Sequence, residues 1–251
     1  KKIALKRRDF ALQFISKQDE ILEIGPFNNP TFRRDLNEKV WSMDMFSKSE
    51  LTQMHKNNPT REPDSIIDVD FVVKDLHFSR SIPRRFDLIA AHHVVEHIAN
   101  LLLWLEECHA LLRDDGRIFL SIPDKRFTFD FFRPVSLASQ VLRSSKEKAE
   151  KPQLWQVVEH FYYHQKVDVN EIWNGNVPSV FRPRFSLKDA IIRAKEREDI
   201  YTDTHCWVFT PESFRMLISD LKESEFISFK LESLQDTQEG SNEFRAILRK
   251  V

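Results

Sequence analysis

The sequence is poor in glycine and cysteine, and it has no long apolar run. Only 4 of its 251 residues are glycine, which leaves little room for loops in which several glycines bring the backbone close to phosphate groups. Its two cysteines, Cys108 and Cys206, are too few for a disulfide framework or a cysteine-rich zinc site. They favour a reducing compartment, and we expect a cytoplasmic protein. Since no apolar run approaches ~18 residues, we expect no transmembrane segment.

Acidic and basic residues are nearly balanced. The chain has 38 lysines and arginines against 39 aspartates and glutamates, which gives a formal net charge of −1. Such a balance provides no general attraction to an anionic membrane or to nucleic acid, so it disfavours nucleic acid as a partner. The first residue is Lys1 and not methionine, which leaves open that the chain is part of a larger multidomain protein.

Strand-like and helix-like segments alternate along the chain. Buried strands are expected at 20–25, 39–46, 66–73, 86–93 and 117–123. Helical spacing of apolar residues covers 3–16, the run from 94 to a C-cap signal at Gly116, and 209–221, where Thr210 is placed as N-cap. Segments 226–234 and 243–250 leave no room for a helix between them, so they should form an antiparallel pair at the sheet edge. The sequence therefore predicts an α/β fold with a doubly wound, seven-stranded, mostly parallel sheet.

Residues 125–204 interrupt this alternation. They are rich in aromatic and basic residues and contain no convincing buried strand. We expect a single domain, residues 1–251, in which 125–204 are an insertion after the fifth strand into a core of about 15–124 and 205–251. Four arginines beside aromatic residues in the insertion are suited to a phosphate or a carboxylate: Arg126, Arg133, Arg182 and Arg184.

The stretch ILEIGPFNNP, residues 21–30, resembles a buried strand that enters a nucleotide-binding loop. A dinucleotide brings a pyrophosphate close to the backbone and requires several glycines, but here only Gly25 permits such an approach. Asp44 follows 19 residues later, at the end of the second expected strand, where an acid can bind a ribose diol. The ligand should therefore resemble a nucleoside and lack a pyrophosphate, which points to S-adenosylmethionine (SAM).

Taken together, these motifs resemble those of class I SAM-dependent methyltransferases. The segments ILEIGPFNNP, SMDM, VVKDLHF and the run from Phe86 to Asp124 correspond to the family's first loop, second-strand acid, adenine segment and fourth-to-fifth-strand unit. The resemblance covers roughly 20–124 and 205–251. The chain departs from the pattern at Phe27, where many members have a second glycine.

The resemblance implies SAM as cofactor and S-adenosylhomocysteine as its product. It implies that Glu23 tethers the loop and faces the amino end of the cofactor, that Asp44 binds the ribose, and that Asp75 contacts adenine. Alternatively, Glu23 is a buried acid satisfied by loop amides, Asp44 caps a helix and Asp75 caps a turn. The full set of expected cofactor residues is Glu23, Gly25, Pro26, Asp44, Met45, Asp75, Leu76, His92 and His93.

Three residues after the fourth strand are candidates for the chemistry. His93, Glu96 and His97 fall at i, i+3 and i+4 and would share one helical face, where a histidine could take a proton from a hydroxyl acceptor. They resemble the acid-x-x-Glu-His cluster that holds a divalent metal in ubiquinone-pathway and small-RNA methyltransferases, with His160 or His164 as a further ligand. Because Glu-His at this point also occurs in metal-free members, we expect no metal.

Asp130 is the third catalytic candidate, beside His93 and His97. It ends the motif Phe127-Thr128-Phe129-Asp130, directly beyond the fifth strand, where the insertion should select the acceptor. Similar chains with this motif are often encoded with glycan-assembly enzymes.

We therefore expect a SAM-dependent O-methyltransferase that acts on a small-molecule or carbohydrate acceptor, with a sugar, nucleotide-sugar or glycan hydroxyl as the target. A non-catalytic module of a glycan-assembly enzyme and an RNA 2′-O-methyltransferase are the alternatives. A nicotinamide oxidoreductase is disfavoured by the single-glycine loop.

Overall fold

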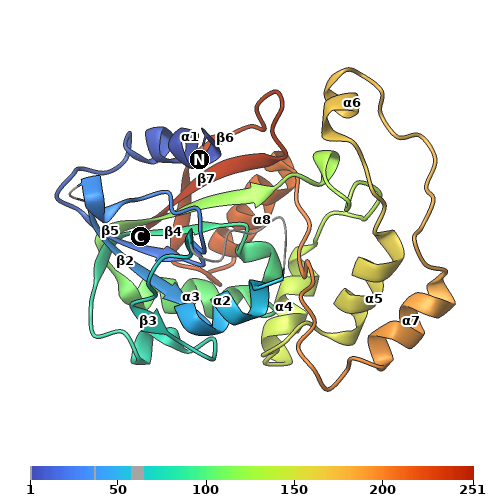
Figure 1. Ribbon diagram of the computed structural model, residues 1–251, viewed down its shortest axis with the longest axis horizontal. Coiled ribbons are helices and arrows are strands. Elements are labelled where there is room, and N and C mark those ends of the chain that lie inside the picture. The colour runs from blue at the N-terminus through green and yellow to red at the C-terminus, as the bar shows by residue number, and fades with distance from the viewer. Residues whose placement is uncertain (1, 37, 58–64) are drawn as a thin grey trace.

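The computed structural model describes residues 2–36, 38–57 and 65–251, and Figure 1 shows a central sheet flanked by helices. The sheet has seven strands in the order β3-β2-β1-β4-β5-β7-β6. Strands β1 to β5 are parallel, whereas β7 pairs antiparallel with both β5 and β6. The predicted doubly wound, mostly parallel sheet and its antiparallel edge are thus confirmed. The strands are β1 (Glu20–Ile24), β2 (Lys39–Asp44), β3 (Phe71–Val72), β4 (Phe86–His92), β5 (Leu112–Pro123), β6 (Phe229–Gln235) and β7 (Glu243–Lys250).

Side chains of β5 show how helices cover both faces of the sheet. Ile118, Leu120 and Ile122 alternate toward the larger core cluster, which includes residues of α3 and α8. Phe119 points to the opposite face, where its ring lies 5.6 Å from that of Phe10 in α1. Helix α1 therefore packs on the sheet as part of the core, although the sequence predicts a core that begins only at about residue 15. The helices are α1 (Lys2–Ala11), α2 (Lys48–His55), α3 (Leu101–Leu111), α4 (Ala138–Lys146), α5 (Leu154–Tyr163), α6 (Val169–Trp173), α7 (Leu187–Lys195) and α8 (Pro211–Glu223).

Several predicted element boundaries were wrong. The strand expected over 66–73 is reduced to Phe71–Val72, so β3 is a short edge strand. The expected C-cap, Gly116, lies inside β5, because α3 already ends at Leu111. Glycine is needed there for another reason: a Cβ would lie 2.9 Å from the carbonyl oxygen of Arg113.

The helix expected directly after β4 also begins later than its apolar spacing predicts. Residues Val95–His97 form one turn of 3-10 helix, η4, and α3 starts only at Leu101. The Asn100 side chain accepts a hydrogen bond from the backbone N–H of Leu103 at 3.2 Å and so caps α3. By contrast, the predicted N-cap of α8 is confirmed: Thr210 Oγ1 accepts from the N–H of Ser213 at 3.1 Å.

Residues 125–204 contain α4 to α7, and Figure 1 shows α5, α6 and α7 in a lobe beside the sheet, on the side to which β5 points. Arg133 attaches this segment to the returning chain. Its buried guanidinium donates to the carbonyl oxygen of His205 at 2.6 Å and pairs with Glu159 at 3.0 Å. Among the described residues, none of the helices combines the length and the apolar character that a membrane span requires.

Candidate functional site

A small hollow of about 180 Å³ lies beyond the carboxyl ends of β1 and β4. In open α/β sheets ligands bind at this edge, where the strand order reverses on either side of the first strand. The hollow brings together five of the predicted cofactor residues with Arg7 of α1; those five are Glu23, Gly25, Pro26, His92 and His93.

Glu23 ties the loop after β1 to the strand. Its buried carboxylate accepts hydrogen bonds from the backbone N–H groups of Thr31 at 2.8 Å and Phe32 at 3.2 Å. Both expected roles are compatible with this position, because the same carboxylate also lines the hollow. Burial raises the pKa of Glu23 to about 7, against the lowering effect of the two amides.

The loop itself departs from ordinary backbone geometry at two positions. Gly25 has φ +63°, and a Cβ there would lie 3.4 Å from Cγ2 of Val94. Phe27, in the place of the family's second glycine, has φ +50°. A residue other than glycine therefore adopts the left-handed conformation at this point, at a cost of roughly 1–2 kcal/mol. The backbone at Phe27 thus has the conformation that a glycine at this position would favour.

The remaining cofactor residues follow β2 and β3 and do not line this hollow. Asp44, half-buried at the end of β2, accepts from the N–H of Phe46 at 3.0 Å, and burial raises the pKa of Asp44. Asp75 is exposed and accepts from the N–H of His77 at 2.7 Å, which is the turn-capping arrangement. Met45 is exposed and Leu76 is half-buried.

A second cavity, of about 650 Å³, lies between the carboxyl end of β5 and the insertion. Its wall combines aromatic rings with cations and, among the described residues, includes no aspartate or glutamate. His93 lines this cavity as well as the first hollow, so the two are adjacent. The side chains that give the cavity its character are Phe127, Phe129, His164, Lys166, Arg182, Arg184 and His205.

Two of the four predicted anion-binding arginines are already neutralised inside the protein. Arg126 pairs with Asp124 at 2.6 Å and with Asp236 at 3.0 Å. Arg133 is buried in the attachment of the insertion. Arg182 and Arg184, in contrast, are exposed on the cavity wall.

His93 is held at the junction of the two hollows. Its backbone has φ +54°, and its Nε2 lies 2.9 Å from Oε2 of Glu243 in β7. Glu243 also binds Arg7, and the pKa of Glu243 is lowered because the hydrogen bonds from His93 and Arg7 outweigh its burial. His92, one residue earlier, bonds Ser121 through Nδ1, and burial holds its pKa well below the usual range.

Glu96 and His97 lie close to His205, which directly follows the insertion in the chain. Donor atoms of Glu96, His97 and His205 all lie within 4.8 Å of one another. The Nδ1 of His205 donates to Oδ2 of buried Asp130 at 2.6 Å. Burial alone would raise the pKa of Asp130, but the hydrogen bond from His205 and the nearby charge of Arg133 together outweigh it, so the pKa lies below its usual value.

His93, Glu96 and His97, which the sequence predicts to lie together, are therefore close in space. They do not share one face of a regular helix, however. His93 lies in a turn before η4, and its Nδ1 is 3.6 Å from Oε1 of Glu96. Oε1 of Glu96 is also 3.7 Å from Nε2 of His97. Of the further histidines named from sequence, His160 and His164 pack around the ring of Phe129.

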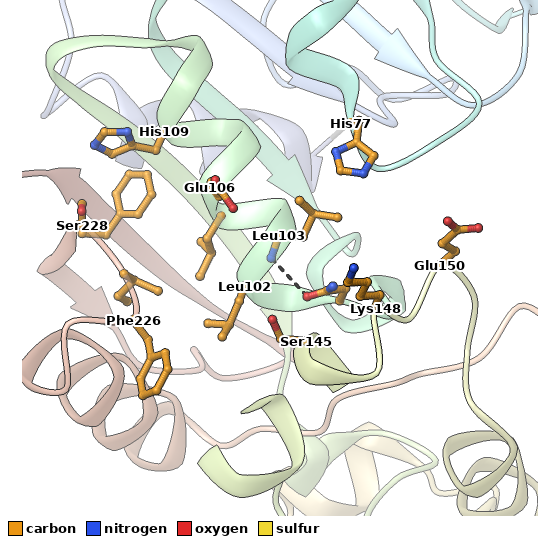
Figure 2. Close-up of a pocket in the computed structure, with 14 residues that line it drawn as sticks. His77, Leu102, Leu103, Glu106, His109, Ser145, Lys148, Glu150, Phe226 and Ser228 are labelled. Atoms are coloured by element: carbon orange, nitrogen blue, oxygen red, sulfur yellow. Dashed lines mark hydrogen bonds between the residues drawn. The ribbon is translucent and has the colours of Figure 1, made fainter. Parts of the chain in front are cut away.

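A third cavity, of about 590 Å³, runs along α3 (Figure 2). Glu106 and His109 face it from α3, Lys148 from the segment after α4, and Phe226 from the segment before β6. This cavity lies beside a helix and not beyond the carboxyl ends of the parallel strands, so we do not assign the ligand site to it.

Comparison with known families decides the class of this protein. A family model described as a methyltransferase domain matches residues 1–220. The chain belongs to this methyltransferase family. The identification as a class I SAM-dependent methyltransferase is thereby confirmed, and SAM is its cofactor.

Solved structures similar to this methyltransferase cover nearly all of it. A structure described as a zinc-dependent alcohol dehydrogenase from Rhodobacter sphaeroides is 13% identical, with a TM-score of 0.51 over 98% of this chain and 90% of that one. The 1,6-didemethyltoxoflavin-N1-methyltransferase of Burkholderia thailandensis is 14% identical, with a TM-score of 0.49 over 99% of this chain and 78% of that one. At such identities the likeness shows the fold alone. No curated protein matches the sequence significantly.

The structure adds polar residues to this methyltransferase's site that sequence reasoning missed. His205, Asp203 and Glu243 all approach the predicted His93, Glu96 and His97 from segments more than 100 residues downstream. No local motif marks them. A possible signal was that His205 lies just where the insertion returns to the sheet, next to Phe209, which bridges to Asp124 at the end of β5.

Proposed function

We propose that this enzyme transfers the methyl group of SAM to a hydroxyl of a small acceptor that carries an anionic group, with a sugar, nucleotide-sugar or glycan as the acceptor class. The observation that carries the proposal is the cavity shared by the sheet and the insertion. Its described wall presents Lys166, Arg182 and Arg184 and no carboxylate, and it meets the first hollow at His93. The guanidinium of Arg184 lies over the ring of Phe185 at 5.3 Å, and the residue is still exposed to solvent. Exposed cations on such a wall favour a phosphate or carboxylate on the ligand.

In this proposal the two hollows have separate tasks. The first receives the amino end of SAM, with Glu23 toward the amino group and with Gly25 and Pro26 beside it. The ribose and adenine extend beyond this hollow toward Asp44 and Asp75. The second, with residues 125–204, selects the acceptor. Its aromatic wall suits a ring: Phe127 stacks on Trp173 at 4.4 Å, and Phe129 on His164 at 4.5 Å.

Methyl transfer from SAM is an in-line displacement, so the protein's contribution is alignment, exclusion of water and removal of the hydroxyl proton. SAM, held by the residues around the first hollow, would supply the methyl group to the acceptor oxygen with S-adenosylhomocysteine as the leaving group, and the oxygen would give up its proton. His93 lines both hollows and keeps Nδ1 on the side of Glu96, while Glu243 holds Nε2. His93 is thus placed to take that proton. Asp130 acts through His205, which it orients, and His97 borders the same cluster.

Transfer of the labelled methyl group of SAM to a panel of hydroxyl compounds tests the function. The panel pairs each sugar with its phosphate or nucleotide derivative. We expect product only with hydroxyl acceptors, and kcat/KM higher for the anionic member of each pair. For that member, Arg184→Ala should reduce kcat/KM by about tenfold or more (about 1.4 kcal/mol), with S-adenosylhomocysteine affinity changed less than about threefold.

The matched control is Lys188→Ala, which removes an exposed cation of α7 that does not line the cavity. It should leave kcat/KM unchanged. Equal transfer to neutral and anionic acceptors would refute the anionic class, and cofactor binding without transfer to any hydroxyl would refute O-methylation.

A further inference from the structure

Glu96 is a buried acid whose carboxylate is not satisfied by the protein. The residue is 1% exposed, and neither Oε1 nor Oε2 has a hydrogen-bond partner among the described residues. The nearest ring nitrogens, Nδ1 of His93 and Nε2 of His97, lie 3.6 and 3.7 Å from Oε1, too far for a hydrogen bond. A buried carboxylate without a partner is strongly destabilising, so this site calls for a positively charged ligand.

Two histidines beside this carboxylate are each held by another acid. The Nδ1 of His205 donates to Asp130 at 2.6 Å, and the Nδ1 of His97 lies 2.8 Å from Oδ1 of Asp203. The ring of His205 is thus fixed at Nδ1 by a hydrogen bond, and Nδ1 of His97 faces Asp203 in an ion pair without hydrogen-bond geometry. In the described part of the chain, Nε2 of each ring remains available as a metal ligand. Carboxylates placed in this way orient metal-binding histidines and increase their basicity.

The three donors converge. One atom each from Glu96, His97 and His205 lie within 4.8 Å of one another, a spacing that a single ion can bridge by drawing the side chains in slightly. Two imidazoles and one carboxylate suit zinc, manganese, iron or cobalt better than magnesium or calcium, which prefer oxygen ligands. Three protein ligands also leave coordination positions open.

We propose that Glu96, His97 and His205 bind a divalent transition-metal ion, with Asp203 and Asp130 as the groups that orient the two histidines. This departs from the sequence-based expectation of no metal, because Asp203, His205 and the pairing of Asp130 could not be placed from sequence. Since His205 also lines the second cavity, the metal site would border the cavity proposed for the acceptor. The role of the ion in positioning and acidifying the acceptor hydroxyl rests on the proposed function, whereas its binding does not.

Cobalt(II) titration of the metal-stripped protein tests the site without any acceptor. We expect saturable visible absorption bands at one equivalent, displaced by zinc. Glu96→Gln keeps the shape of the side chain but removes its charge, and should weaken cobalt binding by about 100-fold or more; Asp130→Asn, which acts through His205, should weaken it by about 10-fold to 100-fold. His77→Gln is the control, because His77 lies 3.7 Å from Glu107 in a similar pair outside this cluster.

Absence of saturable cobalt and zinc binding would overturn the proposal, as would binding that Glu96→Gln leaves unchanged. Affinity for S-adenosylhomocysteine shows whether each variant is folded. If the Glu96→Gln protein is not folded, the cobalt affinity of Asp130→Asn decides. EDTA should abolish methyl transfer without lowering that affinity, and added metal should restore transfer. Metal binding without transfer to any acceptor would refute the proposed function alone, and transfer without metal binding would refute the metal site alone.

Discussion

The imidazole of His205 donates a 2.6 Å hydrogen bond to Asp130, although the two residues stand 75 positions apart in the chain. Asp130 is the last residue of the motif that follows β5. His205 lies where the chain returns from the insertion to the sheet. The insertion between them thus begins and ends at one buried polar pair. Whatever the insertion binds can affect the position of His205, and through it the cluster around Glu96.

Asp130→Asn should therefore impair methyl transfer more than cofactor binding. The amide can hold His205 in place only weakly. We expect kcat to fall about tenfold or more, about 1.4 kcal/mol, while calorimetry shows S-adenosylhomocysteine affinity within about threefold of wild type. Loss of cofactor binding with intact acceptor kinetics would show that the insertion belongs to the cofactor site.

Gly25→Ala should lower both stability and SAM affinity. Its φ of +63° costs a residue with a Cβ roughly 1–2 kcal/mol, and that Cβ would stand in the loop where we place the cofactor. Gly240 offers a matched control, because its φ is +72° with no atom near the position of a Cβ. Gly240→Ala should lower the melting temperature similarly and leave SAM affinity intact. Equal SAM affinities of the two variants would contradict a close approach at Gly25.

Asp44→Ala should reduce SAM affinity about tenfold or more, because a hydrogen bond to a charged group contributes roughly 1.5–3 kcal/mol. Calorimetry provides the measurement. Asp68→Ala removes an acid whose carboxylate pairs with Lys48 on the surface, and we expect it to bind SAM normally. If a folded Asp44→Ala protein binds SAM as well as wild type does, ribose recognition by Asp44 is wrong.

Stability should depend on pH through Glu23. Burial raises its folded-state pKa to about 7, above the unfolded value of 4.5, so the folded protein holds a proton that the unfolded chain releases. The free energy of unfolding should therefore be greatest at low pH for this group and fall as pH rises between these two values, by up to about 3 kcal/mol. Denaturant unfolding at several pH values measures it. In Glu23→Gln the slope over this interval should be smaller, and an unchanged slope would exclude Glu23 as its source.

SAM affinity should show the opposite dependence. The ammonium group that we place beside Glu23 favours the ionised carboxylate, so binding releases a proton and strengthens as pH rises through about 7. Calorimetry in buffers of different ionisation enthalpy would detect that proton. A flat profile would place the amino end of the cofactor elsewhere.

The fold was largely predictable because its signals are local. Apolar alternation identified β1, β2, β4 and β5, and the lack of space between the last two strands identified the hairpin. Errors arose where tertiary contacts override local pattern. The segment 94–100 has helical spacing, but its chain turns through η4 before Asn100 caps α3. Gly116 resembled a C-cap, yet it is required by the close carbonyl of Arg113 inside β5.

The sequence by itself determined the methyltransferase class and the methyl donor, and it predicts the cofactor loop, because these signals lie at strand ends whose residues are neighbours in the chain. Only the tertiary structure decided which cations face a cavity and which are paired with acids, since Asp236 and Glu159 reach Arg126 and Arg133 from distant parts of the chain. It alone brought His205 to Glu96. The residues of this buried polar cluster come from distant segments that pack together at the sheet edge. They need share no motif, because their energy depends on burial and on the charge of their partners and not on their order in the chain.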